Sequence, residues 1–264
     1  MTVAEIDIER YLARIGVDAQ TGPPTLELLR SLQLAHMIHV PFENLHVFHR
    51  RGVRTDVDWS YPKIVDQRRG GWCFELNGAF GALLRAIGFD LDYVSCRVWE
   101  FESKVWGPEL DHLAPVVRLD GSRFLADVGF GDSCIHPLLL EPSELDEVPR
   151  RTRIDTDAVG FSLTELVELE TGAIEWEPQI LLDPRPRTLD EFTGRSRFLE
   201  TDPSSMFNQK PFATRALDGT GSRITLRKGV LRRTTGTQAP TSEPVEDDAT
   251  WNALLLEHFG MTPV

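Results

Sequence analysis

The chain has 264 residues, a formal net charge of −13 and a sequence pI of about 5.0, with 41% hydrophobic and 26% charged residues. This acidity excludes a nucleic-acid binder and a polybasic membrane module, because both need clustered Lys and Arg. The composition is ordinary for a globular protein, and the length exceeds one typical hydrophobic core, so we expect two or three packed domains.

Neither a targeting segment nor a membrane span is expected. The first residues carry no signal-peptide core, and apolar runs such as PLLL (137–140) are far too short to cross a bilayer. The three cysteines, Cys73, Cys96 and Cys134, form no CxxC pair, which argues against a disulfide framework and a zinc ribbon. We therefore expect a cytoplasmic, reduced protein with no membrane partner.

Residues 1–88 are expected to form a helical domain. Apolar residues recur at helical spacing near the start, up to Gly16, and again over 25–40, up to Pro41. The stretch CFELNGAFGALLRAI (73–87) continues the pattern, and Gly88 is well placed to end that helix.

From residue 89 to 187 the hydrophobic period changes toward two, which predicts a small β domain. The dipeptides Asp120-Gly121 and Thr171-Gly172 each separate two strand-like runs, and Asp-Gly is a strong hairpin signal. The stretch DPRPR (183–187) suggests a linker. Residues 188–264 then mix a capped helix start at 188–191, a hairpin and a terminal helix, which predicts an α/β domain.

The stretch RRGGWCFELNGAF (68–80) places Cys73 at the expected start of a helix, directly after Gly70, Gly71 and one tryptophan. Unpaired N–H groups at a helix start favour an ionised thiol and can hold an oxyanion, and glycines leave room for a substrate. The plain alternative is a buried, inert cysteine. That alternative suits Cys96, which lies between valines in a strand pattern, and nothing around Cys134 suggests activation.

A base for this thiol emerges from the first hairpin. With residues 120–121 as a two-residue loop, Ala114 lies opposite Asp127, and His112 projects from the same face as its diagonal neighbour. An imidazole held by a carboxylate on a rigid ribbon is the arrangement that a base for Cys73 requires. A slip of one residue would turn Asp127 to the other face, and His112 would then be an ordinary strand histidine.

Several stretches together resemble the arylamine N-acetyltransferase family. RGGWCFELN (69–77) is similar to the family's signature around its nucleophile, and DHLAPVV (111–117) and LADVGFGD (125–132) to the stretches that carry its histidine and aspartate. Two further stretches, VPFENLHV (40–47) and DPSSMF (202–207), also resemble family segments. The resemblance runs in order from about residue 5 to 215 and is loose in the last fifty residues.

The resemblance implies an α+β fold. It consists of an N-terminal helical bundle (1–88), a central β-barrel (89–187) and a C-terminal α/β lid (188–264). It also implies a cysteine-protease-like triad, Cys73, His112 and Asp127. The expected reaction is a ping-pong transfer of an acetyl group from acetyl-coenzyme A, through a Cys73 thioester, to the nitrogen of an arylamine or hydrazine, as in xenobiotic metabolism.

Further site residues follow from the family-like stretches. We expect Phe42, Phe130 and Phe207 to line an apolar acceptor pocket, and Gly129 and Gly131 to let the coenzyme's pantetheine arm run close to the backbone. An internal ion pair between Glu43 and Arg69 is also expected. The resemblance identifies no partners for the coenzyme phosphates, so the basic candidates are guesses: Lys210, Arg215, Arg232 and Arg233.

Other readings stay open. Asp111 departs from the small hydroxyl residue that related enzymes often place before the histidine, which would alter the imidazole or the coenzyme contact. No metal is expected, because His36, His39, His46 and His49 lack a HExxH pattern and Pro41 interrupts them. The alternatives to an acetyltransferase are an amide synthase that closes a polyketide macrolactam, a thiol hydrolase and a silent binding domain. The oligomeric state is undetermined, a homo-oligomer included.

Overall fold

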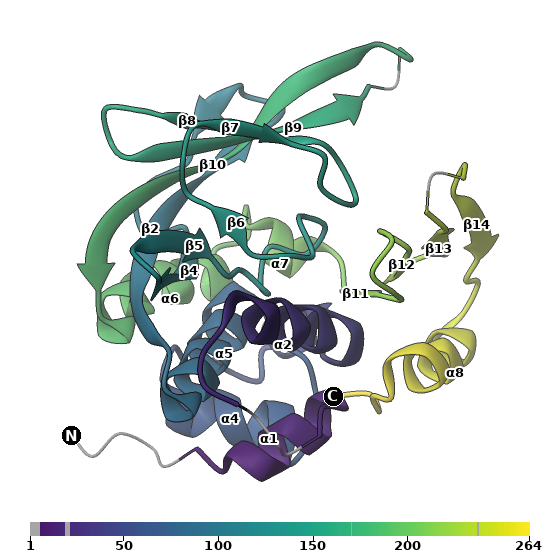
Figure 1. Cartoon of the computed structure of the whole chain (residues 1–264). Helices are drawn as coiled ribbons and strands as arrows, with labels where there is room; N and C mark the ends of the chain where they lie inside the picture. The colour runs from purple at the N-terminus through teal and green to yellow at the C-terminus, as the bar shows by residue number, and fades with distance from the viewer. Residues whose placement is uncertain (1–5, 19–21, 170, 237) are drawn as a thin grey trace.

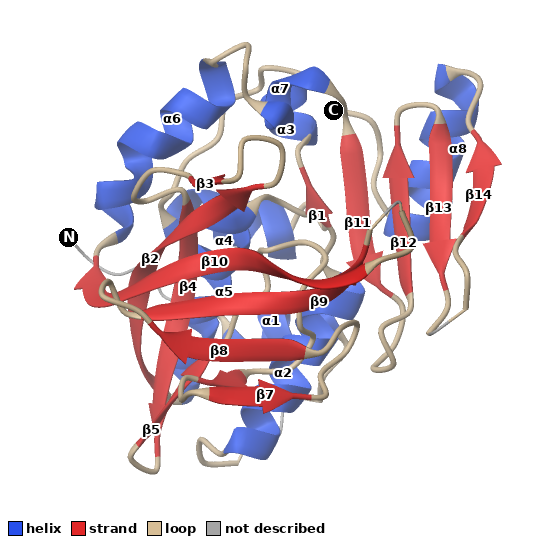
Figure 2. Ribbon diagram, turned by 90° about the horizontal axis from the view of Figure 1, so that it is seen from above, coloured by secondary structure: helices blue, strands red, loops and turns tan. Residues whose placement is uncertain are grey.

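The structure, a computed structural model, describes residues 6–18, 22–169, 171–236 and 238–264. The helices of the N-terminal segment pack together below the strands in Figure 1. They are α1 (Ile8–Ile15), α2 (Leu26–His39), α4 (Val57–Val65) and α5 (Cys73–Ile87), whereas the short α3 (Leu45–Phe48) lies beside α7 (Met206–Gln209) in Figure 2. The predicted stop at Gly16 is confirmed by its left-handed backbone, φ 71°. The first five residues of the predicted first helix lie outside the described residues.

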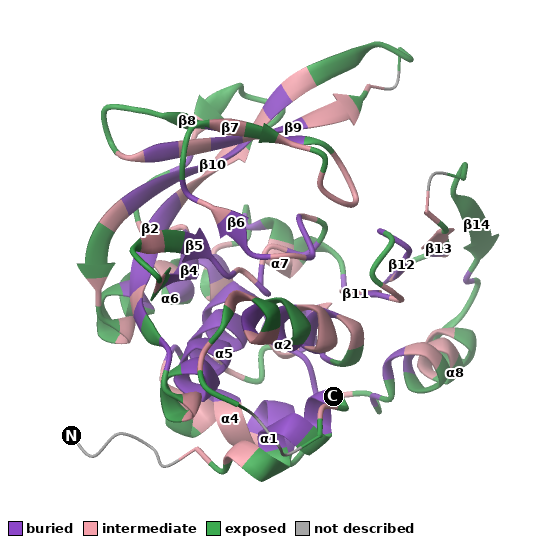
Figure 3. Ribbon diagram, in the orientation of Figure 1, coloured by how far each residue is buried: buried purple, intermediate pink, exposed green. Residues whose placement is uncertain are grey.

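Helix α5 forms the centre of the fold. All but its last three residues are buried (Figure 3), and Phe74, Leu76 and Phe80 belong to the largest hydrophobic cluster. A helix that is apolar all round must be enclosed on every side. Gly88 ends it with φ 111°, as predicted. Because Cys73 is the first residue of this helix, the predicted nucleophile is fixed to a largely buried element.

A nine-stranded antiparallel sheet curls over α5 (Figures 1 and 2). Its order is β6-β5-β4-β2-β10-β9-β8-β7, with β3 paired to β2. The sheet curls into a half-barrel, so the expected β-barrel is present only in part: its edge strands β6 and β7 do not pair within the described residues. The strand bounds are β2 (Asp90–Glu100), β3 (Val105–Trp106), β4 (His112–Leu119), β5 (Ser122–Leu125), β6 (Leu138–Leu139), β7 (Ser143–Leu145), β8 (Thr152–Thr156), β9 (Phe161–Glu168) and β10 (Ile174–Arg187).

Both predicted hairpins of this sheet are present, but the predicted linker is wrong. Leu119 pairs with Ser122, and the two residues between them have positive φ, as a two-residue hairpin requires. Strands β9 and β10 also pair antiparallel. The stretch 183–187 is the end of β10, where Arg187 pairs with Tyr93 of β2 after a register shift. The irregularity accommodates the two prolines, which cannot donate to a regular ladder.

A second sheet joins the two ends of the chain. Its order is β1-β11-β12-β13-β14, and β1 (Phe42–Glu43) comes from the helical segment. The predicted hairpin at 223–233 and the terminal helix are confirmed. The remaining elements are η1 (Leu189–Phe192), α6 (Thr193–Thr201), α7 (Met206–Gln209), β11 (Phe212–Ala216), β12 (Arg223–Arg227), β13 (Val230–Thr234), β14 (Thr241–Pro244) and α8 (Asp248–Phe259). No helix in the described part of the chain is long and apolar enough to cross a membrane.

Candidate active site

The glycine pair before Cys73 has a packing explanation. A Cβ on Gly70 would lie 2.0 Å from the Pro41 carbonyl oxygen, and one on Gly71 would lie 2.8 Å from Glu75 Oε2. The same Glu75 carboxylate accepts a hydrogen bond from the Trp72 N–H, at 3.3 Å. The backbone at residues 70–71 is therefore in close contact with Pro41 on one side and Glu75 on the other. Side chains at 70 and 71 would push Cys73 out of place.

His112 and Asp127 form the contact that the hairpin predicts. Asp127 Oδ2 lies 2.6 Å from His112 Nε2, and both side chains are largely buried. The backbone ladder itself stops earlier: β5 ends at Leu125, followed by one bond from the Ala126 N–H to the Pro115 carbonyl at 3.0 Å. The ribbon therefore does not hold Asp127 in place by ladder bonds, and other groups must do so.

Asn77 is the residue that holds this pair, and the sequence reasoning missed it. Its Nδ2 donates to Asp127 Oδ1 at 2.8 Å and to the Leu113 carbonyl at 2.6 Å, while its Oδ1 accepts from the Val128 N–H at 2.9 Å. Asn77 lies one helical turn after Cys73, so the two share a face of α5. A fully buried amide on an apolar helix was the signal that could have found it.

The buried pair is strongly polarised. Burial disfavours the charged imidazole, but the Asp127 carboxylate and the adjacent Cys73 sulfur outweigh it and raise the pKa of His112 to about 10. Burial acts against the Asp127 anion too, yet the His112 charge and hydrogen bonds from Asn77 and Gly129 lower its pKa. The arrangement therefore favours an imidazolium held between a carboxylate and a sulfur.

The other two cysteines are buried in surroundings that disfavour a thiolate, although Cys96 is the cross-strand partner of His112 in the β2–β4 ladder. Burial raises the pKa of the Cys96 thiol well above its usual value, and it raises that of Cys134 to about 12. Cys134 Sγ lies 3.0 Å from Thr152 Oγ1. Of the three thiols, Cys73 is the one that contributes to the raised pKa of His112.

The three predicted pocket phenylalanines occupy two places. Phe130 stands edge-on to His112, with ring centroids 5.2 Å apart. Phe42 and Phe207 instead belong to an aromatic cluster next to the nucleophile. Its ring centroids lie 5.4 to 6.5 Å apart, and its members are Phe42, Trp72, Phe207 and Phe212.

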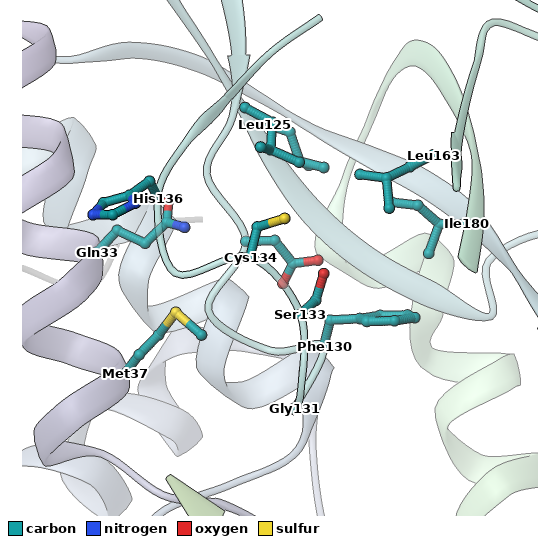
Figure 4. A pocket seen from close by; sticks show the side chains of 12 residues that line it. Gln33, Met37, Leu125, Phe130, Gly131, Ser133, Cys134, His136, Leu163 and Ile180 are labelled. Carbon is teal, nitrogen blue, oxygen red and sulfur yellow. The ribbon is translucent and has the colours of Figure 1, made fainter. Parts of the chain in front are cut away.

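A narrow pocket lies on the Phe130 side of the triad (Figure 4). Phe130 and Gly131 form one side, and apolar side chains of the half-barrel, such as Leu163 and Ile180, form another. Asp127 also lines the pocket. Helix α2 closes it with Gln33 and Met37. His112 itself does not line this pocket, so the structure brings one of the three predicted phenylalanines to it.

Two glycines in the loop after Asp127 are tightly packed. A Cβ on Gly129 would lie 2.8 Å from Asn77 Nδ2 and 2.9 Å from Cys73 Cα, and Gly131 has φ 88°. Glycine at 129 therefore lets the loop touch the start of α5. This packing does not test the predicted contact of Gly129 and Gly131 with the coenzyme's pantetheine arm, which stays a prediction.

The predicted Glu43–Arg69 ion pair is wrong. Glu43 Oε1 instead lies 3.7 Å from Lys63 Nζ, which bonds Glu75 at 2.7 Å. Arg69 donates to the Thr262 carbonyl at 2.9 Å, near the end of the chain. Lys63 of α4, and not Arg69, is therefore the cation beside Glu43. The same buried lysine also balances the charge of Glu75 at the start of α5.

Asp111, the residue before His112, forms an ion pair with an arginine of another element. Its Oδ1 accepts from Arg195 of α6, with nitrogen–oxygen distances of 2.7 and 2.8 Å. The four clustered histidines do not converge either: His36 Nε2 lies 3.0 Å from Tyr11 Oη, and His39 Nδ1 lies 2.9 Å from the Ala35 carbonyl. The contacts of these histidines are structural.

Comparison with known proteins agrees with the motifs and the fold. A sequence model of the N-acetyltransferase family matches residues 25–262. Arylamine N-acetyltransferase 1 of Homo sapiens is 30% identical over 226 residues, which cover 79% of this chain and 77% of that protein. The chain belongs to the arylamine N-acetyltransferase family. It is therefore an acyltransferase by descent, as the resemblance implied.

Solved structures of this family match the whole fold. The arylamine N-acetyltransferase of Salmonella typhimurium gives a TM-score of 0.89 with 28% identity, covering 96% of this chain and 90% of that one. The Mycobacterium marinum enzyme, solved in complex with CoA, gives 0.84 with 28% identity, covering 96% and 92%. A family member from Mycolicibacterium smegmatis is 32% identical over 211 residues, 76% of this chain and 74% of that protein.

Proposed function

We propose that this protein is a ping-pong acetyltransferase in which Cys73 carries the acetyl group from acetyl-coenzyme A to an arylamine or hydrazine. The observation that carries the proposal is the 2.6 Å contact between His112 and Asp127, with Cys73 at the start of a buried helix and among the groups that raise the pKa of His112. The CoA complex of the Mycobacterium marinum relative supports coenzyme A as the donor's carrier. The names of the relatives support an arylamine acceptor.

In the first half-reaction the Cys73 thiolate attacks the acetyl carbonyl carbon of acetyl-coenzyme A. A new C–S bond forms, and N–H groups in the first turn of α5 are available to the oxyanion. The bond to the coenzyme sulfur breaks, and that sulfur takes the proton from the His112 imidazolium. Asp127 holds His112 by Nε2, which leaves Nδ1 to face the sulfur atoms.

In the second half-reaction the amine nitrogen attacks the thioester. Neutral His112 accepts the N–H proton, the Cys73 C–S bond breaks, and the thiolate–imidazolium pair is restored. Phe130 touches both His112 and the apolar pocket, which supports a place for a flat acceptor there. Phe42 and Phe207 would line the opposite, nucleophile side, and Gly129 and Gly131 would border the coenzyme's arm.

Intact-mass spectrometry after incubation with acetyl-coenzyme A tests the first half. We expect one acetyl group on the wild type and on Cys134→Ala, and none on Cys73→Ala. His112→Gln and Asp127→Asn should fold but load at least a hundredfold more slowly, roughly the loss seen when a catalytic base or its orienting group is removed. Normal loading of Asp127→Asn would contradict the role given to that carboxylate.

Adding an arylamine to the loaded protein tests the second half. We expect rapid discharge with formation of the acetylated amine. Equally fast discharge in buffer alone would establish a thiol hydrolase instead. If neither acetyl-coenzyme A nor arylamine reacts with a folded protein, the acetyltransferase proposal fails, and the macrolactam-forming amide synthase would be the next candidate.

A further inference from the structure

His112 is the first residue of β4, so the segment before it affects how the imidazole enters the site. On one side β4 pairs with β2 as far as the pair of His112 with Cys96. On the other side the ladder with β5 begins only at Val116. At His112 the strand is therefore paired on one side alone. The loop that joins β3 to β4, residues 107–111, is the other backbone connection that can hold this end of the strand.

This loop turns through an unfavourable backbone conformation. Leu110 has φ 63°, in the left-handed region that a bulky side chain rarely adopts. Its N–H donates to the buried Ser95 hydroxyl at 2.8 Å, and Ser95 belongs to β2, opposite Leu113. Such a conformation persists only where the surrounding contacts fix it. The turn before His112 is therefore held by specific contacts, and it would relax if they were lost.

An ion pair ties the next residue, Asp111, to helix α6. Arg195 Nε and Nη2 lie 2.8 and 2.7 Å from Asp111 Oδ1, and the side chains of Arg195 and Asp111 are 20% and 13% exposed. The other carboxylate oxygen packs against Gly107, where a Cβ would lie 2.7 Å from it. The Arg195 guanidinium in turn lies over the Phe198 ring, 4.7 Å from its centroid. Both partners are thus fixed by packing, and a pair this sheltered is screened little by salt.

The position of the pair suggests that it acts on the backbone of His112. The Asp111 carboxylate bonds α6, whereas the imidazole bonds Asp127. Arg195 balances the charge of Asp111, so the pair brings little net charge near the imidazole. Its influence on His112 therefore passes through the peptide backbone. A small hydroxyl residue, which related enzymes often place before the histidine, carries no charge and could not form this ion pair.

We propose that Asp111 and Arg195 are positioning residues, whose ion pair fixes the turn before His112 and so keeps the imidazole directed at the Cys73 sulfur. This inference rests on the proposed function for its consequence, since a displaced base would slow transfer of the acetyl group. It assigns a role to the residue by which this sequence departs from related enzymes. It also makes α6, which lies far along the chain, part of the support of the triad histidine.

Alkylation of Cys73 by iodoacetamide reports the placement of His112 without any acyl transfer, because the thiolate is the species that reacts and the imidazolium keeps it ionised. We expect Asp111→Asn and Arg195→Gln each to slow alkylation of the folded protein about tenfold at neutral pH, since small displacements at a reacting centre are costly. The double variant should be no slower than either single one, because both changes remove the same contact. Peptide mass spectrometry measures the modification at Cys73.

Arg118→Gln is the matched control, because it removes an arginine–aspartate pair from the other end of the same strand. Arg118 bonds Asp90 with nitrogen–oxygen distances of 2.6 and 2.7 Å. This variant should alkylate and load at the rates of the wild type. Arg195→Lys, which keeps the charge, should retain more of the alkylation rate than Arg195→Gln does. An equal loss in both Arg195 variants would show that the ion pair is not what matters.

Loading from acetyl-coenzyme A supplies a second readout. In single-turnover measurements Asp111→Asn should lower the limiting rate about tenfold and leave the half-saturating concentration unchanged, because the pair positions a base and binds no substrate. Unchanged or faster alkylation of Asp111→Asn, additive losses in the double variant, or an equal loss in Arg118→Gln would overturn the inference. Slower alkylation of Asp111→Asn, in a protein whose wild type never loads, would support the positioning role and reject the proposed function.

Discussion

His112 and Asp127 are charged partners in a buried setting, so their titration must affect stability. The folded-state pKa of His112, about 10, lies above the ordinary 6.5. Its charge therefore stabilises the fold fully below pH 6.5, and this stabilisation is lost as the pH rises through about 10. Asp127, whose pKa is lowered from 3.8, contributes in the opposite sense: its stabilisation is present above pH 3.8 and is lost as the pH falls further.

We accordingly expect an alkaline loss of stability that belongs to His112. Thermal unfolding followed from neutral pH to pH 10 should show a steeper fall in Tm for the wild type than for His112→Gln, which has no proton to lose there. His49→Gln, at an exposed histidine, should follow the wild type. Parallel curves for all three proteins would contradict a charged His112.

Asn77 links the helix that carries Cys73 to the strand that carries His112 by one hydrogen bond, and to the segment of Asp127 and Val128 by two. Asn77→Ala should lower the free energy of unfolding by about 3 kcal/mol, since it leaves buried groups unpaired. It should also slow acetyl loading about a hundredfold, because small displacements at a reacting centre are costly. Urea unfolding and single-turnover loading measure the two effects.

The control for Asn77 removes a hydrogen bond at a distance from the triad. Thr55→Val replaces the hydroxyl that lies 3.1 Å from Thr193 Oγ1 by an isosteric methyl group. It should lower stability by about 1 kcal/mol and leave the loading rate of the folded protein unchanged. If Asn77→Ala reduced stability alone, as Thr55→Val should, Asn77 would be structural and not a positioning residue.

At the scale of elements, the packing of α5 against β2 depends on a missing side chain. Tyr93 of β2 lies over Gly81, where a Cβ would be 2.5 Å from Tyr93 Cε1, and its hydroxyl donates to the Gly78 carbonyl at 2.7 Å. Alanine normally stabilises a helix interior relative to glycine. At this position the close approach of the ring reverses that preference.

Two glycine-to-alanine changes in helices should therefore have opposite signs. Gly81→Ala should destabilise by about 2 kcal/mol, because α5 and β2 must separate. Gly194→Ala, in α6, meets nothing within 4 Å and should stabilise by about 0.5–1 kcal/mol. Chemical denaturation of both variants decides the matter, and a stabilising Gly81→Ala would show that the contact with Tyr93 is not tight.

On the scale of the whole molecule, the C-terminal sheet connects segments that are far apart in sequence. Strand β1 pairs with β11, and Arg69 bonds the Thr262 carbonyl. We expect these contacts to make unfolding a single transition. Calorimetry and the near-ultraviolet signal of the tryptophans should report the same midpoint, whereas an earlier transition confined to Trp251 of α8 would show that the C-terminal part unfolds on its own.

Local signals explain what could be read from the sequence. Helix stops at Gly16 and Gly88 and the turn at residues 120–121 are set by neighbouring residues, and all three are confirmed. The register of that turn predicted the contact between His112 and Asp127, although Asp127 is held in place by Asn77 and the Gly129 N–H. Domain boundaries at 88 and 187 stay predictions.

Long-range contacts explain what could not be read. The path of β10 through 183–187 is decided by its pairing with β2, so the prolines misled the local pattern. Lys63 as the partner of Glu43, and Asn77 as the support of Asp127, depend on how separate helices and loops meet. No spacing rule within one segment contains that information.

Strand β1 has only two residues, yet it is bonded on both sides. It pairs with β11 on one side, and on the other a parallel bridge joins Phe42 to Gly71, two residues before Cys73. The residues just before the helix of Cys73 are thus connected through β1 to the C-terminal sheet by backbone pairing. A substitution that breaks either pairing of β1 should therefore disturb the start of the helix that carries Cys73, although β1 itself contributes no residue to the triad.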